Sequence, residues 1–295
     1  MKSSRVIPGI LLVALGLCVQ APGLLLLADD GTFREVGRTT ERELNVVLSS
    51  SFGGMFISKG PAEKIMSVDR GADENESPGI NIEYSIRNRV GYADISLGGE
   101  HKEGEHKRGW FNTDSFRGDR WSLRFSDAIP ISFDIELGVG KAQLDLSGLQ
   151  VKDFNLSTGA SEVDLSFDQP NKSSIDNMNI ESGVSKFTGR NLGNANFKHF
   201  KFQGGVGSYT LDFSGKLESE VDVDVEVGLG VVTIVVPENV GAKVIYEKNW
   251  VSRLDCDPDF HLEGEDQYVS DNYSSSSGKM NITVQSGLGS VKIKR

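Results

Sequence analysis

Apolar and polar residues alternate along much of the second half of the chain. Every odd position from Val221 to Val227 is valine, and the even positions hold Asp222, Asp224 and Glu226. This period of two is typical of a β-strand with one buried face and one face in water. The pattern therefore predicts strands whose valines pack inside and whose carboxylates face solvent.

The alternating runs occur in pairs, and each pair is joined by a glycine with Gly or Ser two residues later. Six copies of this unit occupy residues 133–146, 154–167, 178–187, 200–213, 223–236 and 281–294, with first glycines at Gly138, Gly159, Gly183, Gly205, Gly228 and Gly287. Successive glycines lie 21, 24, 22, 23 and then 59 residues apart. Glycine weakens a strand centre unless the backbone bends or another backbone comes close there. We therefore expect these glycines to form a structural column.

A repeat of about 22 residues fits one coil of a β-solenoid, in which each coil pairs with the coils on either side. The repeat predicts an all-β fold, a single-stranded β-solenoid whose coils stack about 4.8 Å apart. The alternative is an antiparallel β-sandwich. That fold would show turn signals roughly every 8–12 residues and no fixed glycine position.

Composition and repeat divide the chain into three regions: residues 1–28, an N-terminal apolar segment; residues 29–127, irregular β-coils; and residues 128–295, the regular solenoid with an excursion at 241–279. In the irregular region we expect 43–60 and 80–99 to be degenerate coils that turn at Gly53–Gly54 and at Gly91. The excursion is expected to cap the last coils, because an open strand edge needs cover.

The N-terminal segment predicts export. Lys2 and Arg5 precede an uncharged stretch, Val6–Ala28, that is long enough to cross a bilayer as a helix. Two interpretations stay open. The stretch is a signal peptide with Val6–Val19 as its apolar core, or it is an uncleaved membrane anchor. Either one places the protein in the cell envelope, membrane-anchored or in the periplasmic or extracellular space.

The net charge of −11 argues against a nucleic-acid partner and against an anionic lipid surface, since both require a basic footprint. The small number of cysteines also limits the chemistry available to the chain. Cys18 lies in the apolar segment, which leaves Cys256 alone in the body of the chain. No disulfide framework and no thiolate metal site are expected.

Several longer motifs point to a known family. The segment Ile129–Pro130 precedes the run GVGKAQLDLSGLQVKDFNLSTGASEVDL, and the chain closes on DQYVSDNYSSSSGKMNITVQSGLGSVKI. With the paired strands before them, these motifs resemble the toast-rack family of bacterial envelope proteins, which is related to the C-terminal domain of LiaF-type cell-wall stress regulators. The resemblance covers most of residues 40–295. It implies a toast-rack-like β-solenoid, no assigned enzymatic activity, and an association with the envelope.

Two acidic clusters were weighed as metal sites. The first is EHKEGEHK, with Glu100, His101, Glu103, Glu105 and His106; the second comprises Asp255, Asp257, Asp259, Glu263, Glu265 and Asp266. The first lacks zinc-site spacing, and its lysines repel a cation. The second lacks the glycine-punctuated loop of an EF-hand. The first is interpreted as a solvated charged loop, and we expect no metal and no cofactor at either cluster.

No catalytic grouping is evident. His199 lies in a strand-like alternation, and the sequence has no nucleophile elbow and no P-loop. An enzyme that cuts polysaccharides would need carboxylates at equivalent positions of neighbouring coils, and Asp145, Asp164 and Asp212 are the candidates. Ordinary outward polar positions explain them as well, so no catalytic residue is expected. Five Asn-x-Ser/Thr sequences occur, at Asn75, Asn155, Asn171, Asn272 and Asn281. In a bacterial protein we expect them to be turns, and in an exported eukaryotic protein they would be modification sites.

These observations favour a non-catalytic, exported, envelope-associated β-solenoid that acts as a binding, scaffolding or adhesion module. Its partner would be an envelope glycan or protein, with contact to the membrane through the N-terminal segment if that segment is retained. Two alternatives stay open: a regulator of a membrane sensor kinase in envelope-stress signalling, and a polysaccharide-cleaving β-helix enzyme.

Overall fold

The computed structural model describes residues 26–29, 33–71, 80–98, 120–247 and 251–295. These residues form one sheet of seventeen strands and a short 3₁₀ helix, η2 (Leu192–Ala195). The strands are β1 (Leu26–Asp29), β2 (Phe33–Gly37), β3 (Glu43–Gly60), β4 (Lys64–Gly71), β5 (Ile80–Arg87), β6 (Val90–Leu97), β7 (Arg120–Ser126), β8 (Pro130–Asp145), β9 (Gln150–Ser166), β10 (Ile175–Arg190), β11 (Phe197–Asp212), β12 (Glu220–Val235), β13 (Val240–Glu247), β14 (Ser252–Cys256), β15 (Phe260–Leu262), β16 (Gln267–Ser270) and β17 (Gly278–Lys294). The all-β solenoid predicted from the repeat is confirmed.

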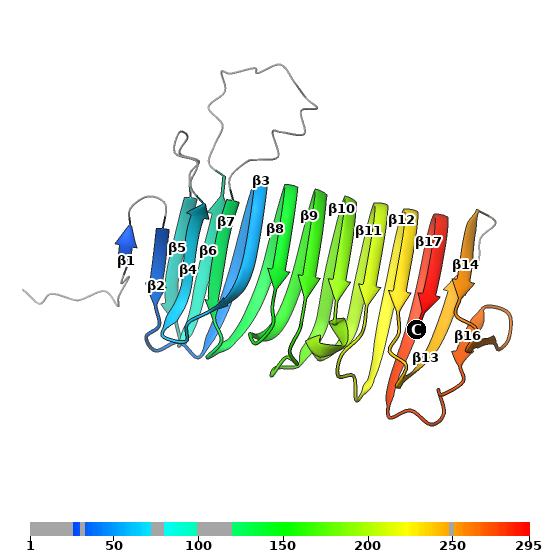
Figure 1. The fold of residues 1–295 in the computed structure, drawn as a ribbon. Helices are drawn as coiled ribbons and strands as arrows, with labels where there is room; N and C mark the ends of the chain where they lie inside the picture. Colours follow the sequence, from blue (N-terminus) through cyan, green and yellow to red (C-terminus); the bar gives the residue numbers. More distant parts are fainter. Residues whose placement is uncertain (1–25, 30–32, 72–79, 99–119, 248–250) are drawn as a thin grey trace, which may run out of the picture.

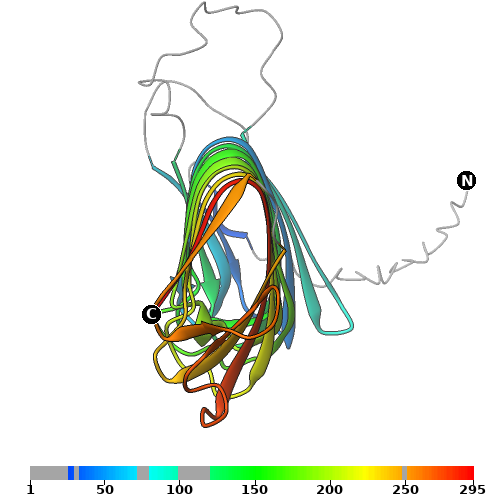
Figure 2. The same ribbon diagram turned by 90° about the vertical axis from the view of Figure 1, so that its right-hand side faces the viewer.

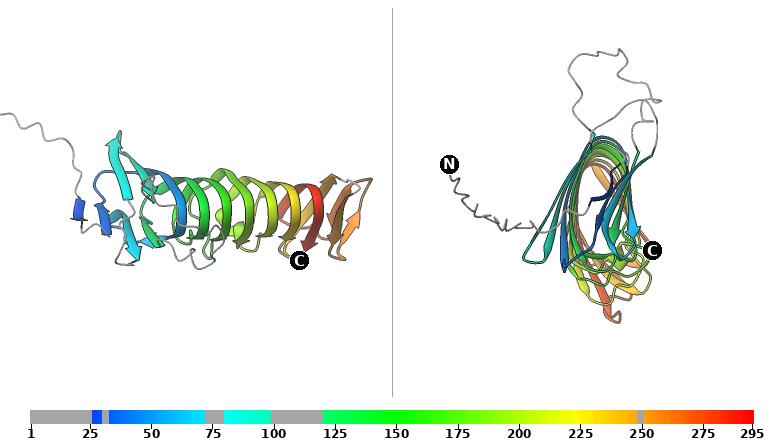
Figure 3. Two further views of the ribbon diagram at one scale, coloured as in Figure 1. Left: turned by 90° about the horizontal axis from the view of Figure 1, so that it is seen from above. Right: turned by 90° about the vertical axis from the view of Figure 1, so that its left-hand side faces the viewer.

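Seven long strands make up the body of the rod: β3, β8, β9, β10, β11, β12 and β17. Seen end-on, each rises on one side, bends at the apex and descends on the other side, so one strand supplies two walls (Figure 2). We call the half before the bend the first wall and the half after it the second wall. Neighbouring coils pair in parallel and in register through both halves. The coils therefore stack side by side along the rod (Figures 1 and 3).

Strand alternation fills the space between the walls. On the first wall of β8, Phe133, Ile135 and Leu137 are buried, whereas Asp134 and Glu136 are exposed. The same positions of the next coils carry further large apolar residues, because the register is kept from coil to coil. One continuous core results, as the valine pattern predicts.

The predicted glycine column lies at the bend. A Cβ atom added to Gly159 would lie 2.4 Å from the carbonyl oxygen of Gly138, and one added to Gly287 would lie 2.4 Å from that of Gly228. Cβ atoms essentially never approach a neighbour within 3.0 Å. Glycine is therefore required at these positions because the backbones of neighbouring coils come too close for a side chain, in addition to any bend of the chain.

The coils at the two ends are not in chain order. At the C-terminal end, β17 lies between β12 and an outer coil, the two halves of which are β13 and β14. At the N-terminal end, β3 lies between β8 and an outer coil whose halves are β6 and β7. Each outer coil is then covered by antiparallel strands: β4 on β7, β5 on β6, and β16 on β13. These strands occupy ladders that would otherwise expose unpaired backbone groups.

The prediction for residues 80–99 is wrong. They do not form a coil that turns at Gly91. Instead β5 and β6 form an antiparallel hairpin whose turn is Asn88–Arg89, both with positive φ (52° and 64°). Gly91 lies inside β6, where an added Cβ would lie 2.8 Å from the hydroxyl oxygen of Tyr84. Glycine is present at position 91 because the Tyr84 side chain packs against it. The sequence alone does not distinguish a glycine of this kind from a glycine in a turn. The proposed division of the chain into regions stays a prediction.

Side chains below the walls hold the connections between coils. Asn171, which is 7% exposed, accepts a hydrogen bond from the backbone N–H of Val151 and donates to the carbonyl oxygens of Val151 and Ala195. At the C-terminal end, the Arg295 guanidinium donates to Asp259 at 2.6 Å and to the carbonyl oxygen of Pro237 at 2.8 Å. Each of these side chains ties together segments from different coils.

Candidate binding trough

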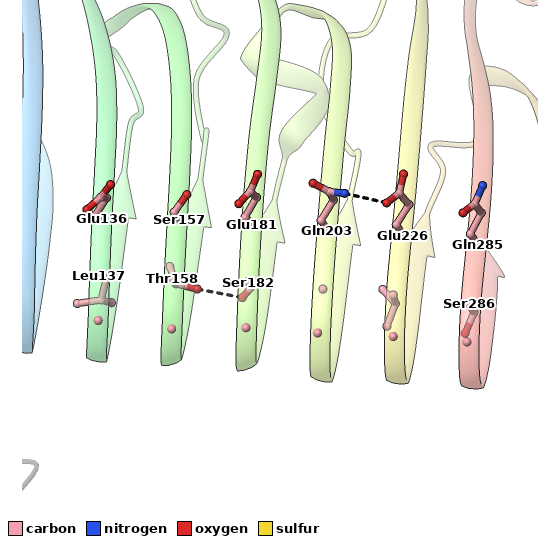
Figure 4. Close-up of a pocket in the computed structure, with 18 of the residues that line it drawn as sticks. Glu136, Leu137, Ser157, Thr158, Glu181, Ser182, Gln203, Glu226, Gln285 and Ser286 are labelled. Atoms are coloured by element: carbon pink, nitrogen blue, oxygen red, sulfur yellow. Dashed lines mark hydrogen bonds between the residues drawn. The ribbon is translucent and has the colours of Figure 1, made fainter.

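A trough follows the first-wall side of the apex across seven coils, with a volume of about 940 Å³. Its floor, the glycine floor, consists of Gly138, Gly159, Gly183, Gly205, Gly228 and Gly287. One bank, the polar row, consists of Glu136, Ser157, Glu181, Gln203, Glu226, Gln285 and Glu247. The first six of these side chains line up coil by coil (Figure 4).

The local sequence explains both parts of the trough. The residue two positions before each floor glycine is an outward position of the first wall, and it holds Glu, Ser or Gln. The glycine itself has no side chain, so nothing fills the space above it. Because the coils stack in register, single-residue gaps merge into one continuous depression.

Carboxylates occupy every second coil of the polar row. In spatial order the row reads Glu136, Ser157, Glu181, Gln203, Glu226, Gln285, Glu247. At about 4.8 Å per coil, the carboxylates recur about every 9.6 Å. Adjacent carboxylates would repel one another at the shorter spacing, and the neutral residues keep them apart. The Gln203 amide nitrogen donates to Glu226 at 2.8 Å.

Insertion of β17 creates this alternation at the C-terminal end. Glu226 and Glu247 belong to strands that follow each other in the chain, β12 and β13. In space, Gln285 of β17 pairs with both of them and separates them. Elsewhere in the row, Glu136 and Glu181 have no hydrogen bond or ion pair to any residue that the structure describes. Their carboxylates are available to a ligand.

The other side of the floor carries an apolar ridge, formed by the residue that follows each of the six floor glycines and by Phe52, which pairs with Val139. The ridge consists of Phe52, Val139, Ala160, Val184, Val206, Leu229 and Leu288. Val184 is 62% exposed and Leu288 is 52% exposed. Seven apolar residues in one line form a contiguous patch, and such patches on soluble proteins mark contact surfaces. None of these residues lines the cavity itself. The ridge borders the glycine floor on the side opposite the polar row, because it holds the next residue of each strand, and we call it the apolar bank.

Hydroxyl groups lie beneath the middle of the trough. Thr158 and Ser182 are hydrogen-bonded at 3.0 Å, and Ser182 is hydrogen-bonded to Ser185 at 2.5 Å. All three side chains are buried. Thr158 and Ser182 occupy the inward position that Leu137 and Val227 hold in other coils, and their hydrogen bond links β9 to β10 below the floor.

Beyond the ridge, on the second wall, the Glu162 carboxylate is paired with two lysines. Glu162 lies 3.3 Å from the Lys186 ammonium and 3.6 Å from that of Lys141. The hydrogen bond from Lys186 holds the pKa of the Glu162 carboxyl below its usual value, with the positive charge of Lys141 adding to the effect. A second hollow of about 480 Å³ lies here, lined in part by Lys141 and Glu162. Unpaired carboxylates thus distinguish the trough from this side of the apex.

The carboxylates considered for glycan cleavage are not aligned as a set. Asp145 pairs across the coils with Ser166, whereas Asp164 pairs with Gln143, two positions away. Asp164 accepts a hydrogen bond from Arg190 at 3.0 Å. Asp145 and Asp212 each accept a hydrogen bond from the backbone N–H two residues later, at 3.0 and 2.8 Å. The prediction that all three could align is therefore wrong, and each has a local structural contact.

His199 and His261 lie on outer surfaces. Nδ1 of His199 lies 3.2 Å from Asp222 on the first wall, and Nε2 of His261 lies 2.6 Å from Asp271 in the C-terminal cap. In the acidic run 255–266, Asp259 is engaged by Arg295. The cluster at 100–107 lies outside the described residues. Among the residues that the structure describes, no three His, Cys, Asp or Glu side chains group as metal ligands.

The prediction that the Asn-x-Ser/Thr sequences are turns holds in part. Asn272 begins a turn, but Asn155 and Asn281 lie within strands β9 and β17, and Asn155 accepts a hydrogen bond from Asn179 at 2.9 Å. Asn171 lies between strands with its side chain buried. Asn75 lies outside the described residues, as does the segment 1–25 on which the export prediction rests. Among the described residues, no helix has the length and apolar character needed to span a bilayer.

Sequence reasoning missed the trough and both of its banks. The sequence contains a pattern that could have revealed the trough, because the polar row and the ridge occupy fixed positions relative to each glycine. The outward residues were interpreted as ordinary solvent-facing positions, since a single coil does not show that they join into a line.

These features define the class of protein: a β-solenoid with a continuous surface trough along its apex. The chain belongs to the toast-rack family, since the family model of the N-terminal domain of toast_rack, DUF2154, matches residues 29–190 and 177–235. The resemblance seen in the sequence is confirmed at this level, and the link to LiaF-type regulators stays a prediction.

Two crystal structures align with the chain over most of its length. One is a candidate cell adhesion protein from Clostridium sporogenes, 23% identical, with 89% of this chain and 97% of the other covered and a TM-score of 0.45. The other is a candidate adhesin from Parabacteroides merdae, 10% identical, with 90% and 96% covered and a TM-score of 0.31. No curated protein matches the chain.

Proposed function

We propose that this protein is a non-catalytic, exported binding module of the cell envelope, and that its trough holds an extended polymer along the rod. The trough supports this proposal because it continues over seven coils at one fixed position of each coil. A compact ligand would touch one or two coils and would need no repeated chemistry. A polymer that lies parallel to the rod meets the same pair of banks at every step.

Export is the second part of the proposal, and it rests on the basic, apolar and acidic order of the first 30 residues. Envelope polymers are long and repetitive, so they suit a repetitive surface. The unpaired carboxylates and the exposed ridge offer polar and apolar contact to one ligand at the same time.

The test is retention of polymers from envelope fractions by the immobilised full-length protein. We expect the parent to retain a glycan or protein component, and a Val184→Asp/Val206→Asp variant to lose it, because charge on the ridge opposes apolar contact. Val184 and Val206 are 62% and 45% exposed, so both substitutions are compatible with folding. Asp134→Asn/Asp224→Asn is a surface control, since both residues face outward on the first wall and neither lines the trough. Retention of nothing, or equal retention by the ridge variant, would refute the proposal.

A further inference from the structure

The spacing of charge in the trough restricts the kind of polymer it fits. Four carboxylates, at Glu136, Glu181, Glu226 and Glu247, lie in one line on every second coil. The interval is about 9.6 Å, twice the separation of stacked coils. A complementary ligand is rigid, straight and cationic, with its positive charges repeated at this interval along one edge.

The three positions between the carboxylates hold Ser157, Gln203 and Gln285. Hydroxyl and carboxamide groups both donate and accept hydrogen bonds, so they suit a ligand rich in hydroxyl groups. The opposite bank offers apolar contact from exposed residues such as Val206 and Leu229, each 45% exposed. The ligand therefore has polar edges and an apolar face.

A β-1,4-linked polysaccharide of amino sugars has each of these properties. Successive rings are turned over, so amino groups on one edge recur at every second ring, an interval close to two coil spacings. Ring hydroxyl groups lie between the amines on that edge, and the axial C–H groups give each ring an apolar face. Unacetylated amines of such a polymer are cationic in mildly acidic solution.

Peptides match less well. The side chains on one face of a β-strand recur about every 6.7 Å, which falls out of step with the carboxylates after one interval. A polyproline II helix repeats about every 9.3 Å and would match only with a basic residue at every third position. The glycan matches through its covalent repeat alone, without a special sequence.

We propose that the trough binds a β-1,4-linked polysaccharide with free amino groups, with one amine opposite each carboxylate and the ring faces against the apolar ridge. This inference rests on the proposed function and names its ligand class. The net charge of −11 adds long-range attraction for such a polycation.

The experiment is calorimetric titration of the full-length protein in mildly acidic buffer with chitosan octamer, which is β-1,4-linked glucosamine and is cationic under those conditions. An exposed ion pair contributes about threefold in affinity. Glu136→Gln and Glu181→Gln should each weaken binding about threefold, and Asp134→Asn, with the same charge change, should weaken it by less than twofold. Chitosan tetramer spans two of the four carboxylates and should bind about tenfold more weakly than the octamer. The fully acetylated octamer should bind at least thirtyfold more weakly.

A charge-conserving variant tests the spacing itself. Glu181→Gln/Gln203→Glu keeps the number of carboxylates but moves one beside Glu226. We expect it to lose at least as much affinity as Glu181→Gln alone. Parent-like affinity of this variant would show that only total charge matters, and would overturn the inference.

The remaining outcomes separate the two proposals. Equal or tighter binding of the peptide (Pro-Pro-Lys)₄ would assign the trough to a basic polypeptide, and no binding of chitosan at all would reject the amino-glycan. Either result leaves the proposed function standing if envelope fractions are still retained. If the protein neither retained any component of envelope fractions nor bound chitosan in the calorimeter, both the proposed function and the amino-glycan inference would be overturned.

Discussion

Replacement of Gly159 by alanine tests the reason for the glycine floor. The new Cβ would lie 2.4 Å from the carbonyl oxygen of Gly138, on the adjacent coil. Contact below 3.0 Å requires a shift, and here the obstructing atom is backbone that is paired with coils on both sides. Neither coil can yield without lengthening hydrogen bonds along the stack.

The magnitude follows from two opposed effects. Overpacking a well-packed site costs about 1–3 kcal/mol. Alanine also lowers the entropy of the unfolded chain, which returns about 0.4–1 kcal/mol at a position without positive φ. Because the obstructing atom is backbone, the overpacking cost of Gly159→Ala should lie near the upper end of the range of about 1–3 kcal/mol. After the entropic gain is subtracted, we expect a net loss of about 2 kcal/mol in the free energy of unfolding. For a chain of 295 residues, an unfolding entropy of about 2.1 cal/mol/K per residue makes that a fall in Tm of about 3–4 °C.

Two further glycines separate crowding from backbone strain. Gly264 has φ +86° and nothing within 4 Å of an added Cβ, so Gly264→Ala carries only a conformational cost of about 1 kcal/mol. Gly289 has φ +144°, and an added Cβ would lie 1.8 Å from the carbonyl oxygen of Gly230. Gly289→Ala should therefore be the most destabilising of the three.

The assay is thermal unfolding followed by far-ultraviolet circular dichroism, with calorimetry to check that unfolding is cooperative, since repeat proteins can unfold in parts. The expected order of stability is parent, Gly264→Ala, Gly159→Ala, Gly289→Ala. If Gly159→Ala were as stable as the parent, approach of neighbouring coils would not be the reason for glycine, and the bend alone would have to explain it.

Three other side chains give separate predictions. Asn171→Ala leaves buried backbone groups of two coils without partners and should cost about 2–4 kcal/mol in urea unfolding; a loss below 1 kcal/mol would contradict this role. Arg295→Ala removes the contacts to Asp259 and Pro237, and hydrogen exchange of β17 should quicken, with β9 as the internal control. Burial of Glu41 acts to raise its pKa, but the hydrogen bonds from Tyr84 and Thr39 outweigh burial and lower that pKa. The ionised carboxylate therefore stabilises the fold at neutral pH, and this stabilisation is lost as the pH falls below about 4. Tyr84→Phe should therefore destabilise more at pH 7 than at pH 3, and an equal loss at both would exclude the ionised carboxylate as the cause.

Much of the fold follows from short-range pattern. The alternation at Val221–Val227 predicts which side chains are buried, because strand geometry sends successive residues to opposite faces. The fixed place of Gly138 and its equivalents predicts a column. Gly91 shows the limit of this reasoning, since its environment is set by Tyr84 of a partner strand and not by its own neighbours in the chain.

The candidate site was predictable only in its parts. Glu136 and Glu181 stand two residues before a glycine, and Val184 stands directly after one. Each position by itself looks like solvent-facing strand. Their meaning as opposite banks of one trough comes from in-register stacking, which joins residues more than 20 positions apart.

The sequence by itself determined that this chain is a stack of bent strands, because burial alternation and close backbone approach are recorded in each repeat. Only the tertiary structure decided the order of the coils. Glu226 and Glu247 follow one another along the chain, and they stand on alternate coils only because β17 returns from the end of the chain to lie between them. Strand pairing over such separations depends on which edges remain open once the other coils have formed, and no local pattern encodes that choice.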